Sequence, residues 1–421
     1  MVFDQSFNQV SISRMLKKSD FLSTPRLRNP SIKAQKIEAA IERARQGFSG
    51  ITFLSETKVK KKTIYRIENF SDELVLRKIN TNIKNLIKIP NTSRDTITAN
   101  IKSLLSEGVA YKIYRLDIKG YYESFDTAEV ISTISSMPKL SLLTKRMVKE
   151  ILTQHISNGG LGVPRGLALS ATLSEAMMLS FDKSVRELPG VFFYSRYVDD
   201  IIIITSGNES EENFKKTVSE LLPSGLGLNE HKTRVCLAPN DVQPYKSNQP
   251  PPAAVLSFEF LGYQFTVCEP PKSDNRSPFR AVQLDIAESK VKKIKTRMTR
   301  ALISYCNNRN FDLLEARFKH LTSNFSVLDA DRERKRLAGI FYNYHRIDVE
   351  NSKALKQLDG YLKKTALSGH GTVFDDFFCK TTVAQRRRLL KFSFERGFRE
   401  KTFMHFSQEN LKLLQECWAY V

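Results

Sequence analysis

Two adjacent aspartates, Asp199 and Asp200, are the residues whose type and spacing point most directly to chemistry. They stand between two apolar, β-rich segments, 191–194 and 201–204, which predict a hairpin whose turn projects both carboxylates at one point. Like charges so close repel each other unless a cation lies between them, and a divalent metal that grips phosphate oxygens is such a cation. On its own, the dipeptide is more often an ordinary solvated hairpin turn.

Asp117 supplies a third carboxylate. It ends a predicted strand, residues 111–116, which can bring its side chain opposite Asp199 and Asp200. Three carboxylates can hold two Mg²⁺ ions about 3.5–4 Å apart, the arrangement that clamps the attacking and leaving oxygens in phosphoryl transfer. Asp117 alone is also compatible with a helix N-cap or a turn. Together with the hairpin, it favours a two-metal site.

Five segments, taken in order, resemble the motifs of reverse transcriptases. They are the first palm motif, the template-strand motif, the metal-binding hairpin, the motif after it and the primer grip, at residues 117–122, 162–170, 197–200, 228–233 and 258–263. The resemblance is strongest to bacterial defence-associated (abortive-infection, or unknown-group) reverse transcriptases, in particular a type 3 defence enzyme. Retron and group II intron enzymes are more distant. It implies an RNA-directed DNA polymerase, a nucleotidyltransferase that adds dNMP to a 3′-OH.

The resemblance implies a metal-binding role for the three aspartates and for one main-chain group. Asp117, Asp199, Asp200 and the carbonyl of Ile118 would bind two Mg²⁺ ions, with Mn²⁺ as a substitute. These ions would stabilise charge while a 3′-OH attacks the α-phosphate of a dNTP.

Further residues match positions that bind the nucleotide in the family. Tyr122 would be the bulky gate that clashes with a ribose 2′-OH; a core aromatic is the alternative reading, and Tyr121 is the other candidate. Lys232 would approach the leaving pyrophosphate to stabilise charge or donate a proton, unless it is a solvated lysine. Basic residues of the fingers would hold the triphosphate, although charge runs are usually solvated faces: Arg77, Lys78, Lys84, Lys88 and Arg94.

The template-strand motif departs from the family pattern. Most members have Pro-Gln-Gly followed by Ser-Pro, whereas this chain has Pro164-Arg165-Gly166 and Ser170-Ala171. Gly166 keeps the close approach of the backbone to a base pair or nucleotide that glycine allows. Arg165 would contact a phosphate or stack on a base, or else form a salt bridge at a helix start. The change bears on templating rather than on nucleotidyl transfer.

Composition agrees with a nucleic-acid enzyme. The chain has 66 Lys and Arg against 45 Asp and Glu, a net charge of +21, which is suited to neutralising phosphates. No apolar stretch approaches the length of a membrane span, and the first residues lack the pattern of a signal peptide. The five scattered cysteines have neither disulfide nor zinc spacing. These features predict a cytoplasmic protein with no membrane partner.

The fold that must position these residues is expected to be α+β, with the right-hand arrangement of polymerases. We expect a helical N-terminal element at 1–50, fingers at 51–110, a palm with a primer-grip hairpin at 111–285, and a helical thumb and C-terminal extension at 286–421. Periodicity predicts strands at 51–54, 63–67, 74–79 and 111–116 and hairpin arms at 258–267 and 279–284. It predicts helices at 34–46, 93–105, 127–136, 140–156, 170–186, 210–222, 290–305, 311–322, 329–344, 352–366, 382–392 and 407–418.

The expected partners are nucleic acid (an RNA template or a non-coding RNA, and a DNA product), dNTPs, and a second polymerase subunit or a second copy of the chain. The implied setting is antiviral defence against bacteriophage. Alternatives are retron-like, template-independent or protein-primed DNA synthesis, and a palm that only binds nucleic acid or a partner. A small-nucleotide cyclase is disfavoured, because the hairpin differs and a primer grip is present.

Overall fold

The computed structural model describes residues 3–59, 62–87, 93–246, 248–250, 252–272, 279–329, 334–367, 369 and 371–418. Contacts divide the chain into two compact units. The first comprises Met1–Ile97 and Ala110–Pro239, and the second comprises Thr98–Val109 and Asn240–Val421. Helices and mostly antiparallel sheets make up both units, which confirms the α+β prediction. Residues 240–285, expected in the palm, belong to the second unit.

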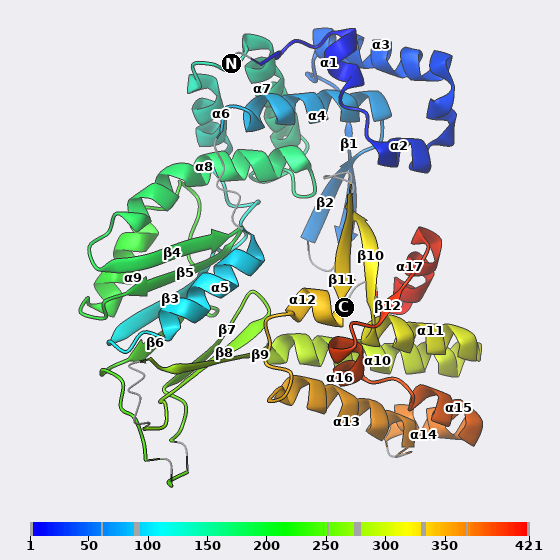
Figure 1. Cartoon of the computed structure of the whole chain (residues 1–421). Helices are drawn as coiled ribbons and strands as arrows, with labels where there is room; N and C mark the ends of the chain where they lie inside the picture. The colour runs from blue at the N-terminus through cyan, green and yellow to red at the C-terminus, as the bar shows by residue number, and fades with distance from the viewer. Residues whose placement is uncertain are drawn as a thin grey trace. The chain divides into compact units, whose positions relative to one another are not determined.

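A four-stranded antiparallel sheet forms the centre of the first unit, in the order β4-β5-β3-β6 (Figure 1). Its strands are β3 (Tyr111–Asp117), β4 (Val191–Tyr197), β5 (Asp200–Thr205) and β6 (Arg234–Ala238). The isoleucine run of β5 suits a buried strand, because branched side chains pack well on a pleated surface. Tyr114, Leu116, Ile201 and Ile203 point into the main core, so the alternation of side chains puts Asp117 and Asp200 on the opposite face.

Helices on the core face of this sheet, and further helices packed on them, form one large hydrophobic cluster. They are α3 (Pro30–Gln46), α4 (Phe70–Lys84), α6 (Thr127–Ser136), α7 (Leu142–Ser157), α8 (Ala168–Arg186) and α9 (Glu211–Glu220). The unit also contains α1 (Gln9–Ser13), α2 (Lys18–Ser23), η1 (Pro25–Arg28) and the hairpin of β1 (Leu54–Val59) with β2 (Lys62–Ile67). Helix α3 ends at Gln46, the predicted end, and Gly47 caps it with a φ of 84°, which suits glycine.

The strand predicted at 74–79 is wrong, since these residues lie inside α4. The Asn69 side chain accepts a hydrogen bond from the Ser71 amide and caps the helix. Leu74, Ile79 and Ile83 are fully buried although they lie on different sides of the helix, so α4 is enclosed around much of its circumference. The short apolar run imitates a strand because a buried helix is apolar over a wide face.

A three-stranded sheet begins the second unit, with β7 (Leu256–Phe260), β8 (Tyr263–Cys268) and β9 (Ala281–Ile286) in that order. The prediction of one arm over 258–267 is wrong, because the chain reverses at Leu261 and Gly262. Both residues have positive φ, 46° and 83°, and the glycine allows the tight turn. The second predicted arm, 279–284, corresponds to β9, shifted by two residues.

The remainder of the second unit is largely helical. Its helices include α10 (Glu288–Asn308), α11 (Phe311–Thr322), α13 (Lys353–Leu367), α14 (Thr372–Cys379), α15 (Val383–Leu389), α16 (Phe394–Arg399) and α17 (Gln408–Gln415), with η2 (Glu416–Trp418) at the end. Helix α5 (Arg94–Leu105) is divided between the two units. Among the described residues, no helix combines the length and apolar character needed to cross a membrane.

The helix predicted at 329–344 is wrong over most of its length. The structure has β10 (Asn324–Asp329), β11 (Arg334–Gly339) and then only a short helix, α12 (Ile340–Tyr344); residues 330–333 lie outside the described part. Strand β10 pairs antiparallel with β11 and parallel with the two-residue β12 (Phe403–Met404). The pairing with β12 is a contact of long sequence separation, which local periodicity cannot indicate.

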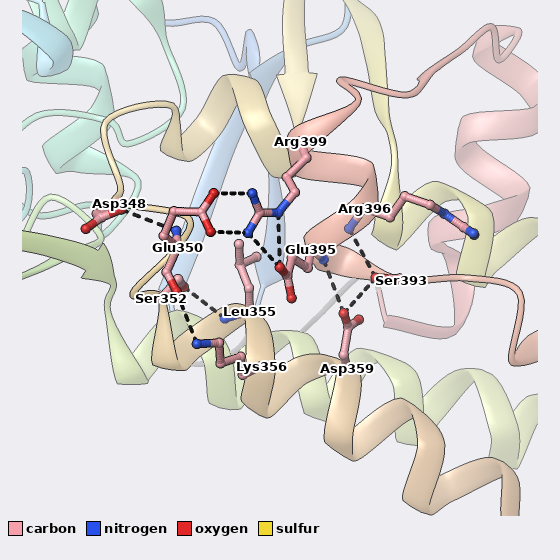
Figure 2. A network of polar contacts seen from close by, with 10 residues as sticks. All are labelled: Asp348, Glu350, Ser352, Leu355, Lys356, Asp359, Ser393, Glu395, Arg396 and Arg399. Carbon is pink, nitrogen blue, oxygen red and sulfur yellow. Dashed lines mark hydrogen bonds and ion pairs between the residues drawn. The ribbon is translucent and has the colours of Figure 1, made fainter.

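A polar network holds α16 against α13 (Figure 2). The Asp359 carboxylate accepts hydrogen bonds from the Ser393 hydroxyl (2.7 Å) and the Phe394 amide (2.6 Å), so it caps the first turn of α16 from another helix. Arg399, at the other end of α16, pairs with Glu350 and Glu395. The cap satisfies amides that the helix itself leaves open, whereas the exposed ion pairs add little.

Candidate active site

The register of the central sheet brings the aspartates together. Asp117 is the direct partner of Asp200 across β3 and β5, and the Ile118 amide donates to the Asp199 carbonyl at 3.1 Å. Asp117 is buried and Asp200 is half-buried. Burial raises the pKa of the Asp200 carboxyl, and the neighbouring Asp199 and Asp117 carboxylates raise it further. The fold therefore places Asp117 beside Asp200, and Asp199 next to the end of β3.

Val198 forms the turn between the two strands in a left-handed conformation, with a φ of 62°. A branched residue there is strained, so the surrounding structure must hold it. Arg196 does so from β4, since its Nη1 donates to the Val198 carbonyl at 3.0 Å. The position of Asp199 thus depends on a turn that Arg196 stabilises.

Arg196 lies in a buried network that the sequence analysis missed. Its guanidinium binds both oxygens of Asp182 (2.8 and 2.9 Å) and both oxygens of Glu175 (3.0 and 2.7 Å), and it donates to the Tyr121 hydroxyl (3.3 Å). Its side chain is only 5% exposed, so the two carboxylates compensate a desolvated charge. The signal available in the sequence was a charged residue inside an apolar strand, directly before the Tyr197 motif.

Lys232 lies at the carboxylate cluster. Its Nζ contacts Asp117 Oδ1 at 2.9 Å and Oδ2 at 3.1 Å, while the Asn229 side-chain amide donates to Oδ2 at 3.1 Å. The Asn229 backbone amide also donates to the Asp117 carbonyl, at 2.7 Å. The segment that follows α9 therefore closes over the end of β3, and its lysine partly neutralises the first aspartate.

The donor set fits a divalent cation by its chemistry. Hard cations such as Mg²⁺ prefer carboxylate and carbonyl oxygens. Burial, and then the neighbouring carboxylates, raise the pKa of Asp200, and a bound cation would favour its ionised form. Within the described part of the chain, however, no three acidic, histidine or cysteine side chains converge into a ready-made metal site. In this conformation, the Lys232 ammonium and the Asn229 amide occupy the oxygens of Asp117.

The two tyrosines after β3 have different surroundings. Tyr121 is buried and packs edge-on against Phe125, with ring centroids 5.2 Å apart. Tyr122 is partly exposed, and its ring centroid lies 5.2 Å from that of Tyr121. Burial raises the pKa of the Tyr122 hydroxyl, and Asp199 is among the carboxylates that add to the effect. Tyr121 is thus the core aromatic, and Tyr122 is the ring nearer the solvent side of the site.

Arg165 forms the salt bridge that was one of its two sequence interpretations. Its Nε and Nη2 donate to the two Glu123 oxygens at 2.5 and 2.8 Å. Gly166 has a φ of 110°, and a Cβ there would lie 2.7 Å from both the Ile64 side chain and the Tyr65 carbonyl. The close approach that this glycine permits is therefore to strand β2.

Two of the basic residues of the predicted fingers, Arg77 and Lys78, have structural partners. Arg77 forms a two-pronged ion pair with Asp20 (2.7 and 3.0 Å), and the buried Lys78 donates to the Asp4 carbonyl at 2.6 Å. Both contacts tie α4 to the N-terminal segment. Arg94 begins α5 and is half-buried, Lys84 is exposed, and Lys88 lies outside the described residues.

Comparisons with known proteins give a family match. Residues 56–265 match the family model described as reverse transcriptase (RNA-dependent DNA polymerase). No curated protein matches the chain.

Similar solved structures include two telomerase structures from Candida Tropicalis. One is apo telomerase truncated from the C-terminal domain, with 14% identity and a TM-score of 0.34. The match covers 56% of this chain and 58% of the telomerase chain. The other is telomerase with a TWJ fragment of telomeric RNA (13% identity, TM-score 0.37), of which this chain spans 68% with 93% of its own length. At these identities and scores, neither likeness carries an argument about this chain.

Proposed function

We propose that this chain, an RNA-directed DNA polymerase by its reverse transcriptase domain at residues 56–265, adds dNMP to a 3′-OH at Asp117, Asp199 and Asp200. The observation that carries the proposal is the β3–β5 register, which pairs Asp117 with Asp200 and ties the Ile118 amide to the Asp199 carbonyl. A palm used only for binding would have no physical need to keep three repelling carboxylates together.

The three carboxylates and the Ile118 carbonyl would hold two Mg²⁺ ions, or Mn²⁺ in their place. When bound, such ions stabilise charge on the attacking and leaving oxygens of phosphoryl transfer. Lys232 partly neutralises Asp117 before the substrate arrives. Because its side chain is 58% exposed, it can turn toward a leaving pyrophosphate and stabilise charge or donate a proton there.

Tyr122 is the proposed gate against a ribose 2′-OH. Its partial exposure and its electrostatic coupling to Asp199 support the assignment over Tyr121, which is fully packed in the core. Tyr122→Ala should bring the rate with ribonucleotides closer to the rate with deoxynucleotides, measured as the ratio of kcat/KM values. An unchanged ratio would remove Tyr122 from this role.

The proposed setting is bacterial antiviral defence, with a non-coding RNA and a second polymerase subunit or a second copy of the chain as partners. The order and residues of the five motifs and the net charge of +21 support this proposal. The cytoplasmic location stays a prediction. Because Arg165 is engaged by Glu123, the residue that replaces the family's glutamine is not free for a base. This favours template-independent or protein-primed synthesis as the second candidate.

The test is incorporation of labelled dNTPs, singly and together, by protein purified with its co-purifying RNA in Mg²⁺. Asp199→Asn should abolish incorporation and leave RNA binding intact, whereas Asp375→Asn, the same change at an exposed residue of α14, should have no effect. Sequencing the products would identify template and primer. Synthesis retained in Asp199→Asn would refute the site, and no synthesis by the wild type would favour a binding palm.

A further inference from the structure

Arg165 contacts two consecutive residues of the segment after β3. Its guanidinium makes the two-pronged ion pair with Glu123, and its central carbon lies 4.9 Å from the centroid of the Tyr122 ring. The side chains of Arg165 and Glu123 are 20% and 34% exposed, so water only partly screens the pair. The Arg165 side chain therefore contacts both Tyr122, the proposed gate, and Glu123, the residue after it.

The main chain around Arg165 is fixed as well. The Val163 amide donates to the Tyr122 carbonyl at 2.9 Å, and the Tyr65 amide of β2 donates to the Arg165 carbonyl at 2.7 Å. Gly162, with a φ of 59°, lies so close that a Cβ would be 2.3 Å from the Tyr122 carbonyl oxygen. The main chain of Arg165 is therefore fixed relative to Tyr122, and only the torsions of the arginine side chain remain to be ordered when it binds.

Only an arginine suits this double contact. Its planar guanidinium offers parallel donors to a carboxylate while its face lies on an aromatic ring. Glutamine, the residue usual at this position in the family that the sequence resembles, has neither the charge nor the parallel donors. The other neighbour of the Tyr122 ring, Tyr121, is itself held by burial and by the Arg196 hydrogen bond.

We infer that the Glu123–Arg165 pair is a positioning device for the Tyr122 ring, and that selectivity between deoxy- and ribonucleotides depends on it. The inference rests on the proposed function of Tyr122 as the gate. Arg165 acts through the ring and not by touching substrate, since Nε and Nη2 are both used by Glu123. A ring that moves freely would admit a 2′-OH that a fixed ring excludes.

The experiment measures the ratio of kcat/KM for a dNTP to that for the matching rNTP in a set of variants. Arg165→Gln should lower the ratio about two- to fivefold, the range expected when one partly exposed cation–π interaction is removed. Glu123→Gln should lower it as well, because it weakens the ion pair that holds the guanidinium over the ring. Arg165→Lys, which keeps the charge but loses the fork, should restore the ratio only in part. In the Tyr122→Ala background, Arg165→Gln should cause no further change.

Each outcome has a distinct meaning. If Tyr122→Ala leaves the ratio unchanged, the gate assignment and the inference both fail. If Tyr122→Ala lowers it but Arg165→Gln does not, only the inference fails. A further drop when Arg165→Gln is added to Tyr122→Ala would mean that Arg165 touches substrate directly, which also overturns the inference.

A second measurement needs no substrate. Denaturant unfolding of wild type, Tyr122→Leu, Arg165→Gln and the double variant gives the coupling between the two side chains. The two single changes should be clearly non-additive, because both remove the same interaction. Additive changes would overturn the inference even if the protein were inactive, so its failure is separable from failure of the proposed function.

Discussion

Asp200 has a raised pKa, and this shift makes the stability of the fold depend on pH. Its pKa is raised by burial and by Asp199 and Asp117, so the folded protein favours its protonated form more than the unfolded chain does. The resulting stability is present below the ordinary pKa of 3.8 and is lost as the pH rises through the higher folded value. At neutral pH, the ionised carboxylate therefore destabilises the fold unless a cation lies beside it.

Asp200→Asn should consequently be more stable than the wild type at pH 7 in EDTA. The difference should shrink when Mg²⁺ is added, because the ion stabilises the wild type and has fewer ligands in the variant. Denaturant unfolding under both conditions measures this, with the exposed Asp375→Asn as the control. A variant less stable than the wild type in EDTA would contradict the argument.

Lys232 makes the second prediction at this scale. Lys232→Met removes the cation that contacts Asp117, so the metal-free protein should lose about 0–1 kcal/mol, the range for an ion pair that is partly exposed to water. Added Mg²⁺ should then raise the Tm of the variant more than that of the wild type. Equal Tm shifts in the two proteins would indicate that the lysine does not influence the metal site.

At the scale of elements, side chains of β4 attach the β4–β5 hairpin to α8. Arg196 leaves β4 and binds Glu175 and Asp182 of α8, and the Tyr194 hydroxyl donates to Asp182 at 2.5 Å. The same arginine holds the strained turn at Val198. A helix and a strand pair thereby set the position of Asp199 through one buried charge.

Arg196→Met should destabilise the protein by about 3–5 kcal/mol, since it leaves two carboxylates without their buried partner. Arg45→Met is the matched control, because Arg45 is 75% exposed and its ion pair with Glu42 lies on the surface. That control should cost less than about 1 kcal/mol. The free energy of unfolding in denaturant distinguishes the two, and similar losses would show that the network does not support the fold.

For the molecule as a whole, the charge of +21 is the property that we expect to govern association with the proposed nucleic-acid partner. Positive side chains release counterions from phosphates, so affinity depends steeply on salt. Helix α10 carries several of these cations, and Lys292 and Arg300 are exposed on it.

Lys292→Ala and Arg300→Ala should each weaken RNA binding at every sequence tested. The slope of log K against log salt should fall by about one unit for each phosphate that the variant no longer neutralises. Binding titrations between low and moderate salt measure the slope, with Lys216→Ala, an exposed lysine of α9, as the control. If the slope of log K against log salt in Lys292→Ala and Arg300→Ala equals that of the wild type and of Lys216→Ala, α10 is excluded from the RNA interface.

The sequence by itself predicted the chemistry that is proposed for this protein. Asp117, Asp199 and Asp200 were identified from residue type and from their places at strand ends, and the structure brings them together through the β3–β5 register. Helices with long apolar periodicity, such as α7 and α8, were also predicted, because one face of each must be buried. Residue types and helical periodicity are local features, so the sequence pattern is enough to show them.

Only the tertiary structure decided how those residues are held. Whether 74–79 is a strand or a buried helix depends on what packs around it, and the pairing of β10 with β12 joins distant segments. Arg196 and Arg165 likewise bind carboxylates from other segments of the chain, Asp182 and Glu123. A charged side chain takes the partner that folding brings within reach, and the free energy of that choice depends on burial, which a linear sequence does not contain.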